Sequence, residues 1–265
     1  MPAPTDLVNW TNPDEMPQDI FTVGGPGKVP RKWNAAPHKH KKCQLLLPVS
    51  GALSCEVEDG LWIVPPKSAL WIPNGAMHSM KAMGQLKGYD TFIAPRVAAG
   101  LPKICCSLSV SPLLHELIVR SSSLPVNYEK DGIALHLTAL ILEEIATAKI
   151  EKVYVPMPLD SRIQRIFYMM MDNPKERANM ETWSKRAGVS ERTLSRLLTQ
   201  ETGMSFGRWR QQLNVVLAVR WLAQGSSIQQ VATNLGYESV PSFVTMFRKT
   251  LGTPPGRYMA ERYTE

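Results

Sequence analysis

One short sequence pattern occurs twice in this chain, and the repeat restricts the fold more than any other feature. The stretches QETGMSFGRW and KTLGTPPGRY align Gly203 with Gly252, 49 positions later, and Arg208 with Arg257. Self-similarity at a fixed period indicates one supersecondary unit used more than once. The C-terminal part of the chain is therefore expected to contain two copies of a small structural unit.

Each copy has the pattern of two helices joined by a glycine turn. In the first copy, Trp183 and Ala187 lie on an apolar stripe at helical spacing that ends at Gly188. Ser190 is a suitable N-cap for the helix that follows. In the second copy Gly236 takes the place of Gly188. The pattern predicts two helix-turn-helix units.

The stretch between the copies, SFGRWRQQLNVVLAVRWLAQG, predicts one helix of about 18 to 20 residues, which would be ~30 Å long. One turn of B-DNA is about as long, ~34 Å. Net charge is also uneven, at +1 for residues 1–157 and +6 for residues 158–265. A solvated basic surface accounts for this charge alone, but with the repeat it favours binding to double-stranded DNA.

The outward side chains on the second helix of each copy are the candidate base-reading residues. Those of the first copy are Arg192, Ser195, Arg196 and Thr199. Those of the second copy are Val240, Pro241, Ser242, Val244, Thr245 and Arg248. Arginine can bind guanine with two hydrogen bonds worth ~1 to 3 kcal/mol of discrimination, whereas valine contacts only a thymine methyl group. The first copy is therefore expected to carry more sequence specificity.

These residues carry a family resemblance. Residues 158–265 resemble the C-terminal DNA-binding domain of AraC-type transcriptional regulators, through AGVSERTLSRLLTQETGMSFGRW and SIQQVATNLGYESVPSFVTMFRKTLGTPPGRY. The resemblance implies seven helices, the first within LDSRIQRIFYMMMDNP, a base-reading role for the outward residues, and homodimers.

The first part of the chain has the pattern of a β domain. Between Asp19 and Pro95, short β-rich runs alternate with turn sequences such as SGA and MGQ. The runs are CQLLLPV, ALSCEVE, LWIVPP, ALWIP, MHSMKAM and KGYDTFIA. This spacing predicts an antiparallel barrel or sandwich.

Three histidines form a candidate effector site in this domain. His38 and His40, two residues apart, would point to the same face of a strand, and His78 would join them from another strand. Three imidazoles suit a divalent transition metal such as nickel or zinc. The spacings H-x-H-x3-Q-x6-G and P-x-G-x2-H resemble the two cupin motifs, which implies His38, His40, Gln44 and His78 as ligands. Gln44 replaces the usual glutamate.

Other interpretations of this site remain open. On an unbroken strand Lys42 would point into the same cavity as the histidines, which disfavours a cation and favours an organic anion such as a carboxylate. A barrel that binds nothing is a third interpretation. A metal-dependent cupin enzyme fused to a DNA-binding module is the competing function. A regulator needs only binding, and we therefore expect no catalytic activity.

Two further stretches, SPLLHELIVRSS and DGIALHLTALILEEIATA, are helical by spacing. The second is apolar over more than one stripe, with Ile133, Leu137 and Leu140 on one face and Leu135 beside them. It predicts a dimerisation helix, although burial within one chain explains the same pattern. KIEKVYVPMPLD is the predicted linker.

The sequence thus predicts an α+β two-domain protein. Its segments are a cupin-like β-barrel over residues 1–108, a helical dimerisation segment and linker over 109–157, and an all-α double helix-turn-helix domain over 158–265. Four cysteines without a C-x-x-C pair, and no secretory leader in MPAPTDLVNW, predict a cytoplasmic protein with no membrane span. The predicted function is a transcriptional regulator of promoter DNA, modulated by a small effector, with RNA polymerase as a further candidate partner.

Overall fold

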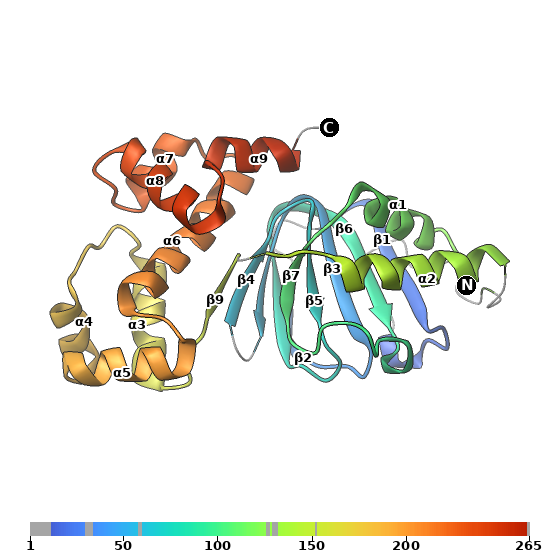
Figure 1. Ribbon diagram of the computed structural model, residues 1–265, viewed down its shortest axis with the longest axis horizontal. Coiled ribbons are helices and arrows are strands. Elements are labelled where there is room, and N and C mark those ends of the chain that lie inside the picture. Colours follow the sequence, from blue (N-terminus) through green and yellow to red (C-terminus); the bar gives the residue numbers. More distant parts are fainter. Residues whose placement is uncertain are drawn as a thin grey trace. The chain divides into compact units, whose positions relative to one another are not determined.

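The computed structural model describes residues 12–29, 34–57, 60–125, 128, 132–151 and 153–263 (Figure 1). The stretch MPAPTDLVNW lies outside the described residues. The chain divides into two compact units, one made of Met1–Val57 and Val64–Glu151 and the other of Glu58–Ile63 and Lys152–Glu265. A search of the described helices finds none with the length and apolar character that a bilayer span requires.

An antiparallel sheet forms the first unit. Its strands are β1 (Ile20–Val29), β2 (Asn34–His38), β3 (Cys43–Val57), β5 (Ser68–Ile72), β6 (His78–Ile93), β7 (Cys106–Ser109) and β8 (Ile150–Glu151). They are ordered β1-β6-β3-β5-β7-β8, and β2 also pairs with β6. Short 3-10 helices, η1 (Pro13–Glu15) and η2 (Pro95–Val97), lie before β1 and after β6.

The two faces of this sheet have different roles because side chains alternate along each strand. Leu45 and Leu47 of β3 pack in the main core with the helices α1 (Pro112–Ser121) and α2 (Gly132–Thr147), which lie beside the sheet in Figure 1. Gln44, which has the opposite parity, pairs in register with Phe92 of β6. This second face carries the candidate effector site.

The sequence prediction divided β3 and β6 wrongly. CQLLLPV and ALSCEVE were expected as two strands joined by the turn SGA, but they form one strand of 15 residues. MHSMKAM and KGYDTFIA likewise form one strand of 16 residues. In β3 the register shifts between Pro48 and Ala52, so the turn residues produce a β-bulge instead of a chain reversal. The strands β1 and β7 were not predicted, and the strand expected to carry both His38 and His40 is β2, which ends at His38.

Seven helices are described in the second unit, the number that the family resemblance implies. They are α3 (Ser161–Asp172), α4 (Met180–Ala187), α5 (Glu191–Thr202), α6 (Phe206–Ala223), α7 (Ile228–Asn234), α8 (Val240–Leu251) and α9 (Pro255–Tyr263). This unit also contains most of β4 (Gly60–Val64), which pairs antiparallel with β9 (Tyr154–Pro156). The predicted linker therefore includes two short strands, β8 and β9.

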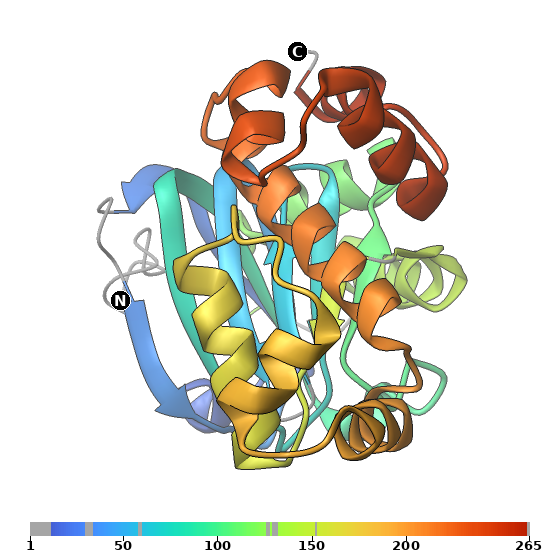
Figure 2. The ribbon, with the colours of Figure 1, turned by 90° about the vertical axis from the view of Figure 1, so that its left-hand side faces the viewer.

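The long helix α6 is the central element of the second unit. It has 18 residues, as predicted, and begins where the Ser205 side chain accepts a hydrogen bond from Arg208 N. Its side chains are buried on several sides, including Leu213, Val216 and Ala218. Figures 1 and 2 show α6 running between the pair α4–α5 and the pair α7–α8. One straight element thus carries both helix-turn-helix units.

Candidate functional site

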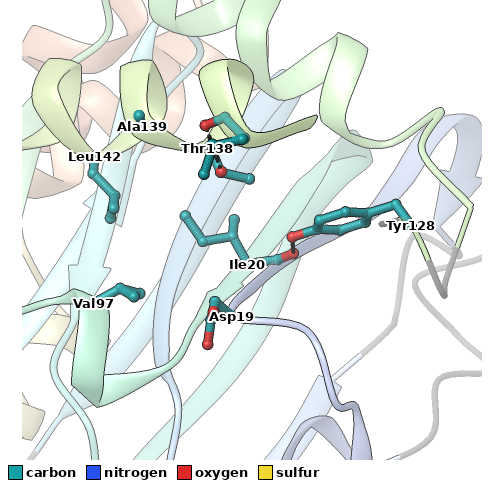
Figure 3. A pocket seen from close by; sticks show the side chains of 8 residues that line it. Asp19, Ile20, Val97, Tyr128, Thr138, Ala139 and Leu142 are labelled. Atoms are coloured by element: carbon teal, nitrogen blue, oxygen red, sulfur yellow. Dashed lines mark hydrogen bonds between the residues drawn. The ribbon is translucent and has the colours of Figure 1, made fainter. Parts of the chain in front are cut away.

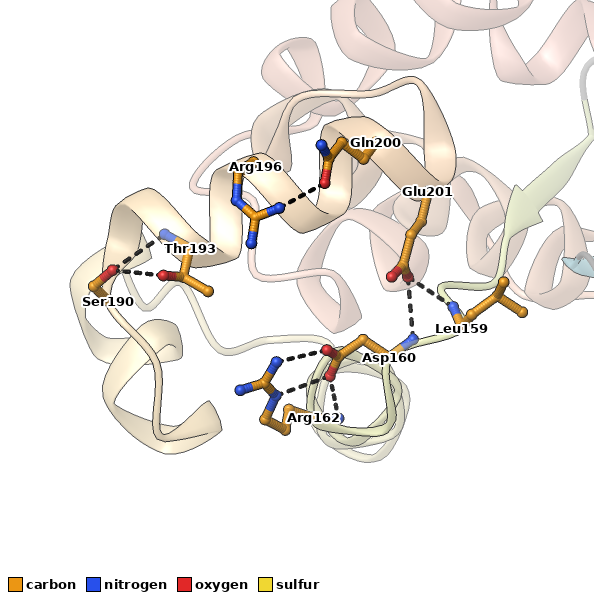
Figure 4. A network of polar contacts seen from close by, with 8 residues as sticks. All are labelled: Leu159, Asp160, Arg162, Ser190, Thr193, Arg196, Gln200 and Glu201. Atoms are coloured by element: carbon orange, nitrogen blue, oxygen red, sulfur yellow. Dashed lines mark hydrogen bonds and ion pairs between the residues drawn. The ribbon is translucent and has the colours of Figure 1, made fainter.

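The first helix-turn-helix unit, α4 and α5, is called the first module below. Gly188 ends α4 in a left-handed conformation with φ of +69°, and the Ser190 side chain then accepts from Thr193 N at 3.1 Å to begin α5 (Figure 4). Leu194 and Leu198 are fully buried. These caps and apolar contacts fix which face of α5 is turned outward.

All four predicted base-reading residues of the first module lie on that outward face. Arg192, Ser195, Arg196 and Thr199 are exposed. Arg196 Nη1 donates to Gln200 Oε1 of the same helix at 2.8 Å (Figure 4). In the described part of the chain neither arginine forms an ion pair, so both positive charges remain available to a polyanion.

The second helix-turn-helix unit, α7 and α8, is called the second module. The Ser239 side chain caps α8 by accepting from Ser242 N, and Phe243 and Phe247 are fully buried. The predicted residues Pro241, Ser242, Thr245 and Arg248 are exposed, whereas Val240 and Val244 are half-buried. The two valines therefore offer less surface to a partner than the first module's arginines do.

The three histidines come together in the first unit. The nearest ligand atoms of His38, His40 and His78 all lie within 4.8 Å of one another. In each ring Nδ1 donates to a backbone oxygen two residues away in the chain. His38 donates to Ala36 O at 2.8 Å, His40 to Lys42 O at 2.6 Å, and His78 to Ala76 O at 2.9 Å. The Nε2 atoms therefore carry the lone pairs of the neutral rings.

These Nε2 atoms lack suitable partners within the described residues. Those of His38 and His78 are buried without a hydrogen bond. That of His40 lies 3.0 Å from Gln44 Oε1, which is also an acceptor. Burial is the main cause that lowers the pKa of His40 and lowers that of His78 to about 4. The rings of His40 and His78 are thus neutral near pH 7, the form that binds metals.

Sequence reasoning missed Asp90, a buried carboxyl group beside this site. Gln44 Nε2 donates to Asp90 Oδ2 at 2.8 Å, while Asp90 Oδ1 is buried without a partner in the described part of the chain. Burial raises the pKa of Asp90 to about 8, and the hydrogen bond from Gln44 opposes that shift. Alternation offered a signal, since Asp90 has the same parity as Phe92, the register partner of Gln44.

The expectation that Lys42 points into the histidine site is wrong. It assumed an unbroken strand, but β2 ends at His38 and β3 begins at Cys43, so strand parity does not apply between them. Lys42 Nζ instead donates to the backbone oxygens of Met16 at 2.8 Å and Gln18 at 2.6 Å. The main charge argument against a cation in this site is thereby removed.

The donor set therefore fits a divalent transition metal. Three imidazoles and an amide oxygen are suitable ligands. A cation between His40 Nε2 and Gln44 Oε1 would also satisfy these two acceptors, which now face each other. Asp90, which accepts from Gln44 Nε2, would fix the orientation of the Gln44 amide.

A separate recess lies beside α2 (Figure 3). It has a volume of about 160 Å³ and is mainly apolar. Its lining residues are Asp19, Ile20, Val97, Tyr128, Leu135, Thr138, Ala139 and Leu142. The Tyr128 hydroxyl donates to Ile20 O at 2.6 Å, and Asp19 forms an ion pair with Arg96. The polar groups at this recess are already bonded, in contrast to those of the histidine site.

Comparisons with known proteins agree with the C-terminal geometry. A family described as a helix-turn-helix domain matches residues 183–261. The HTH-type transcriptional regulator NimR of Escherichia coli is 37% identical over 227 residues, which cover 86% of this chain and 83% of NimR. The regulator RipA of Corynebacterium glutamicum is 31% identical over 103 residues, 39% of this chain and 31% of RipA.

Among solved structures, fatty-acid-bound ToxT of Vibrio cholerae aligns over 92% of this chain and 95% of its own, with a TM-score of 0.40 and 12% identity. The match to NimR confirms the predicted family resemblance and does not support the competing enzyme interpretation, and the two units of the structure confirm the predicted two-domain fold class. The extent of the match to NimR and the two helix-turn-helix units lead to one conclusion: the chain belongs to the AraC family of helix-turn-helix transcriptional regulators, which bind DNA and are not enzymes.

Proposed function

We propose that this regulator reads promoter DNA with α5 and α8, placed in successive major grooves. Arg192, Ser195, Arg196 and Thr199 would contact bases from the first module. Val240, Pro241, Ser242, Val244, Thr245 and Arg248 would do so from the second module. The observation that carries the proposal is the exposure of Arg192 and Arg196 on a capped helix whose other face is buried.

The length of α6 supports this arrangement. Its 18 residues span ~27 Å at ~1.5 Å per residue, and the modules extend beyond its ends. Successive major grooves on one face of B-DNA repeat every ~34 Å. The first module offers two arginines to base edges and the second only Arg248, so we expect α5 to contribute more of the specificity.

For the effector we favour a divalent transition metal, nickel or zinc, in the histidine site. His38, His40 and His78 would hold it through Nε2, and Gln44 through Oε1. A carboxylate effector is the alternative, but it would need positive charge. The nearby Lys42 ammonium is already bonded to two backbone oxygens, and His40 and His78 are neutral near pH 7.

We further propose that the protein is a homodimer joined through α2. Ile133 and Leu140 remain 71% and 47% exposed although they lie on a strongly apolar helix. A second copy would bury them. Such a dimer would act at promoters in the cytoplasm, and RNA polymerase is a further partner to test.

A selection experiment tests the DNA proposal. The full chain is mixed with a pool of randomised double-stranded DNA, and bound sequences are enriched over several rounds. The expected result is a site with two conserved elements about 10 base pairs apart, centre to centre. Enrichment of a single element, or of none, would contradict the two-module arrangement.

The effector proposal has its own measurement. Protein purified without chelators or a histidine tag is analysed for metals, and DNA binding is then measured with and without added zinc or nickel. We expect one metal ion per chain and a changed Kd for DNA. Because coupling is reciprocal, DNA must change the metal affinity by the same factor. Metal binding with no effect on DNA affinity would contradict the effector role.

A further inference from the structure

The chain between α3 and α4, residues 173–179, packs directly against the turn of the second module. Gly236 in that turn has a φ of +72°, and a Cβ atom at this position would lie only 2.5 Å from the backbone oxygen of Lys175. Only glycine meets both conditions without displacing the neighbouring backbone. The connection that leads into α4 of the first module therefore also contacts the turn between α7 and α8 of the second module.

Arg177 bonds this connection to the second module through two contacts. Its Nε atom donates to Gly236 O at 3.0 Å, and its guanidinium lies 4.1 Å from the ring centroid of Tyr237. The Tyr237 hydroxyl in turn accepts from Asn214 Nδ2 of α6 at 3.3 Å. The turn of the second module is thus held both by the connection and by the long helix.

Arg210 bonds the same connection to α6. Its Nη1 atom donates to Ala178 O at 2.9 Å, and its Nη2 atom donates to Glu176 O. The Glu176 side chain accepts from Arg186 Nη2 of α4 at 2.5 Å. A continuous set of polar contacts therefore runs from α4 through the connection and α6 to the turn between α7 and α8. We call this set the brace.

The brace adds polar contacts to the packing of the second module's helices against α6. The covalent link between α6 and the second module is a short loop that contains Gly225 at a φ of +91°, so these side contacts add to what holds the module's orientation. When two linked modules bind one duplex, a fixed orientation of the modules increases the affinity, because less conformational entropy is lost when the second module binds. If the second module were rotated, α5 and α8 would also fit DNA elements separated by a different number of base pairs.

We propose that Arg177 and Arg210 are positioning residues that fix the orientation of the two modules and so set the half-site spacing the protein accepts. This inference rests on the proposed function in that both modules are taken to bind DNA. It assigns the spacing preference to side chains that lie away from the base-reading faces of α5 and α8.

Spin-label distances test the brace without DNA. Glu191→Cys on α5 and Lys249→Cys on α8 place labels at two exposed positions, while the four native cysteines are buried. In the full chain we expect a narrow distance distribution, which broadens when Arg177→Gln is added. Tyr237→Leu, which removes the ring under Arg177, should broaden it similarly. Arg257→Gln, which breaks an exposed ion pair with Glu261, is the matched control and should leave the distribution narrow. Unchanged widths in both brace variants would overturn the proposal.

The proposed effect of the brace on half-site spacing is tested with DNA sites in which the distance between the two elements is changed. DNA selected with the unmodified protein is lengthened or shortened by one base pair between the two elements, and Kd values are measured. The brace variant Arg177→Gln should bind the original spacing about 5-fold more weakly and discriminate less between spacings. If it loses affinity equally at all spacings, the positioning role is wrong. If the Kd of the unmodified protein is the same at every spacing, the proposal that both modules bind DNA is wrong instead. The spin-label distances then still show whether the brace fixes the orientation of the modules.

Discussion

Gln44 donates its side-chain amide to Asp90 at 2.8 Å, and this bond turns the Gln44 oxygen toward His40. Gln44 replaces the glutamate that is usual in cupins, and this hydrogen bond places a carboxyl group next to its side-chain amide. The neutral amide would serve as the ligand, and Asp90 would fix the orientation of the amide.

The first prediction concerns Asp90. With little change in volume, Asp90→Asn replaces the carboxyl group that accepts from Gln44 by an amide, which is a weaker acceptor and cannot ionise when a cation binds. Zinc or nickel affinity, measured by competition with a chromophoric chelator, should fall about 10- to 100-fold. Glu56→Gln, on the exposed side of β3, is the control and should bind normally. If Asp90→Asn strengthened the binding of a carboxylate instead, the effector would be an anion.

The second prediction separates effector response from DNA binding. His40→Ala should abolish the effect of metal on DNA affinity while leaving metal-free DNA binding unchanged, because His40 lies in the first unit. His115→Ala, which removes a histidine on α1 that contacts the neighbouring Glu116, serves as the control. Fluorescence anisotropy with labelled DNA measures both properties. A full metal response in the His40 variant would exclude the histidine site.

The third prediction concerns the dimer. Leu140→Glu puts a charge on the exposed apolar face of α2, and sedimentation velocity should show a dimer become a monomer at micromolar concentration. Leu159→Glu changes a leucine that is 77% exposed outside that helix and should not alter the assembly. A dimer that persists in the Leu140 variant would mean that another surface joins the subunits.

The fourth prediction concerns pH and the start of α3. Asp160 caps this helix by accepting from Arg162 N at 2.9 Å, and its side-chain hydrogen bond with Arg162 is the main cause that lowers its pKa to about 2 (Figure 4). Asp160→Ala should lower the free energy of unfolding by about 1 kcal/mol at pH 7.

The sign of the pH effect follows from the direction of that shift. The pKa of Asp160 is lower in the folded than in the unfolded state, so its contribution is complete above pH ~4 and is lost as pH falls toward 2. Urea denaturation should therefore show the difference from the Ala variant shrinking from pH 7 to pH 3. A difference that stays constant over this range would contradict the assignment.

The helical part was largely predictable because its signals are local. Ser190, Gly188 and Ser205 determine where helices begin and end through contacts within a few residues, and apolar spacing identified the buried faces. The histidine grouping was also predictable from spacing, although its basis in strand parity was wrong for His40, which lies after the end of β2.

What the sequence did not predict depends on contacts between distant residues. Asp90 meets Gln44 only through the pairing of β3 with β6, 46 positions apart. Arg177 meets Tyr237 because two turns pack together, and Lys42 meets Met16 and Gln18 because the chain bends before β3. Such contacts follow from tertiary register, which spacing along one chain does not contain.

The central claim is that α5 reads bases through its exposed arginines. It is tested most directly by measuring the Kd of the unmodified protein and of Arg196→Ala for every single-base variant of the selected DNA site. The account predicts that the variant loses ~1 to 3 kcal/mol of discrimination at one base-pair position and keeps the rest of the profile. An Arg196→Ala profile that matches the unmodified protein at every position would contradict it.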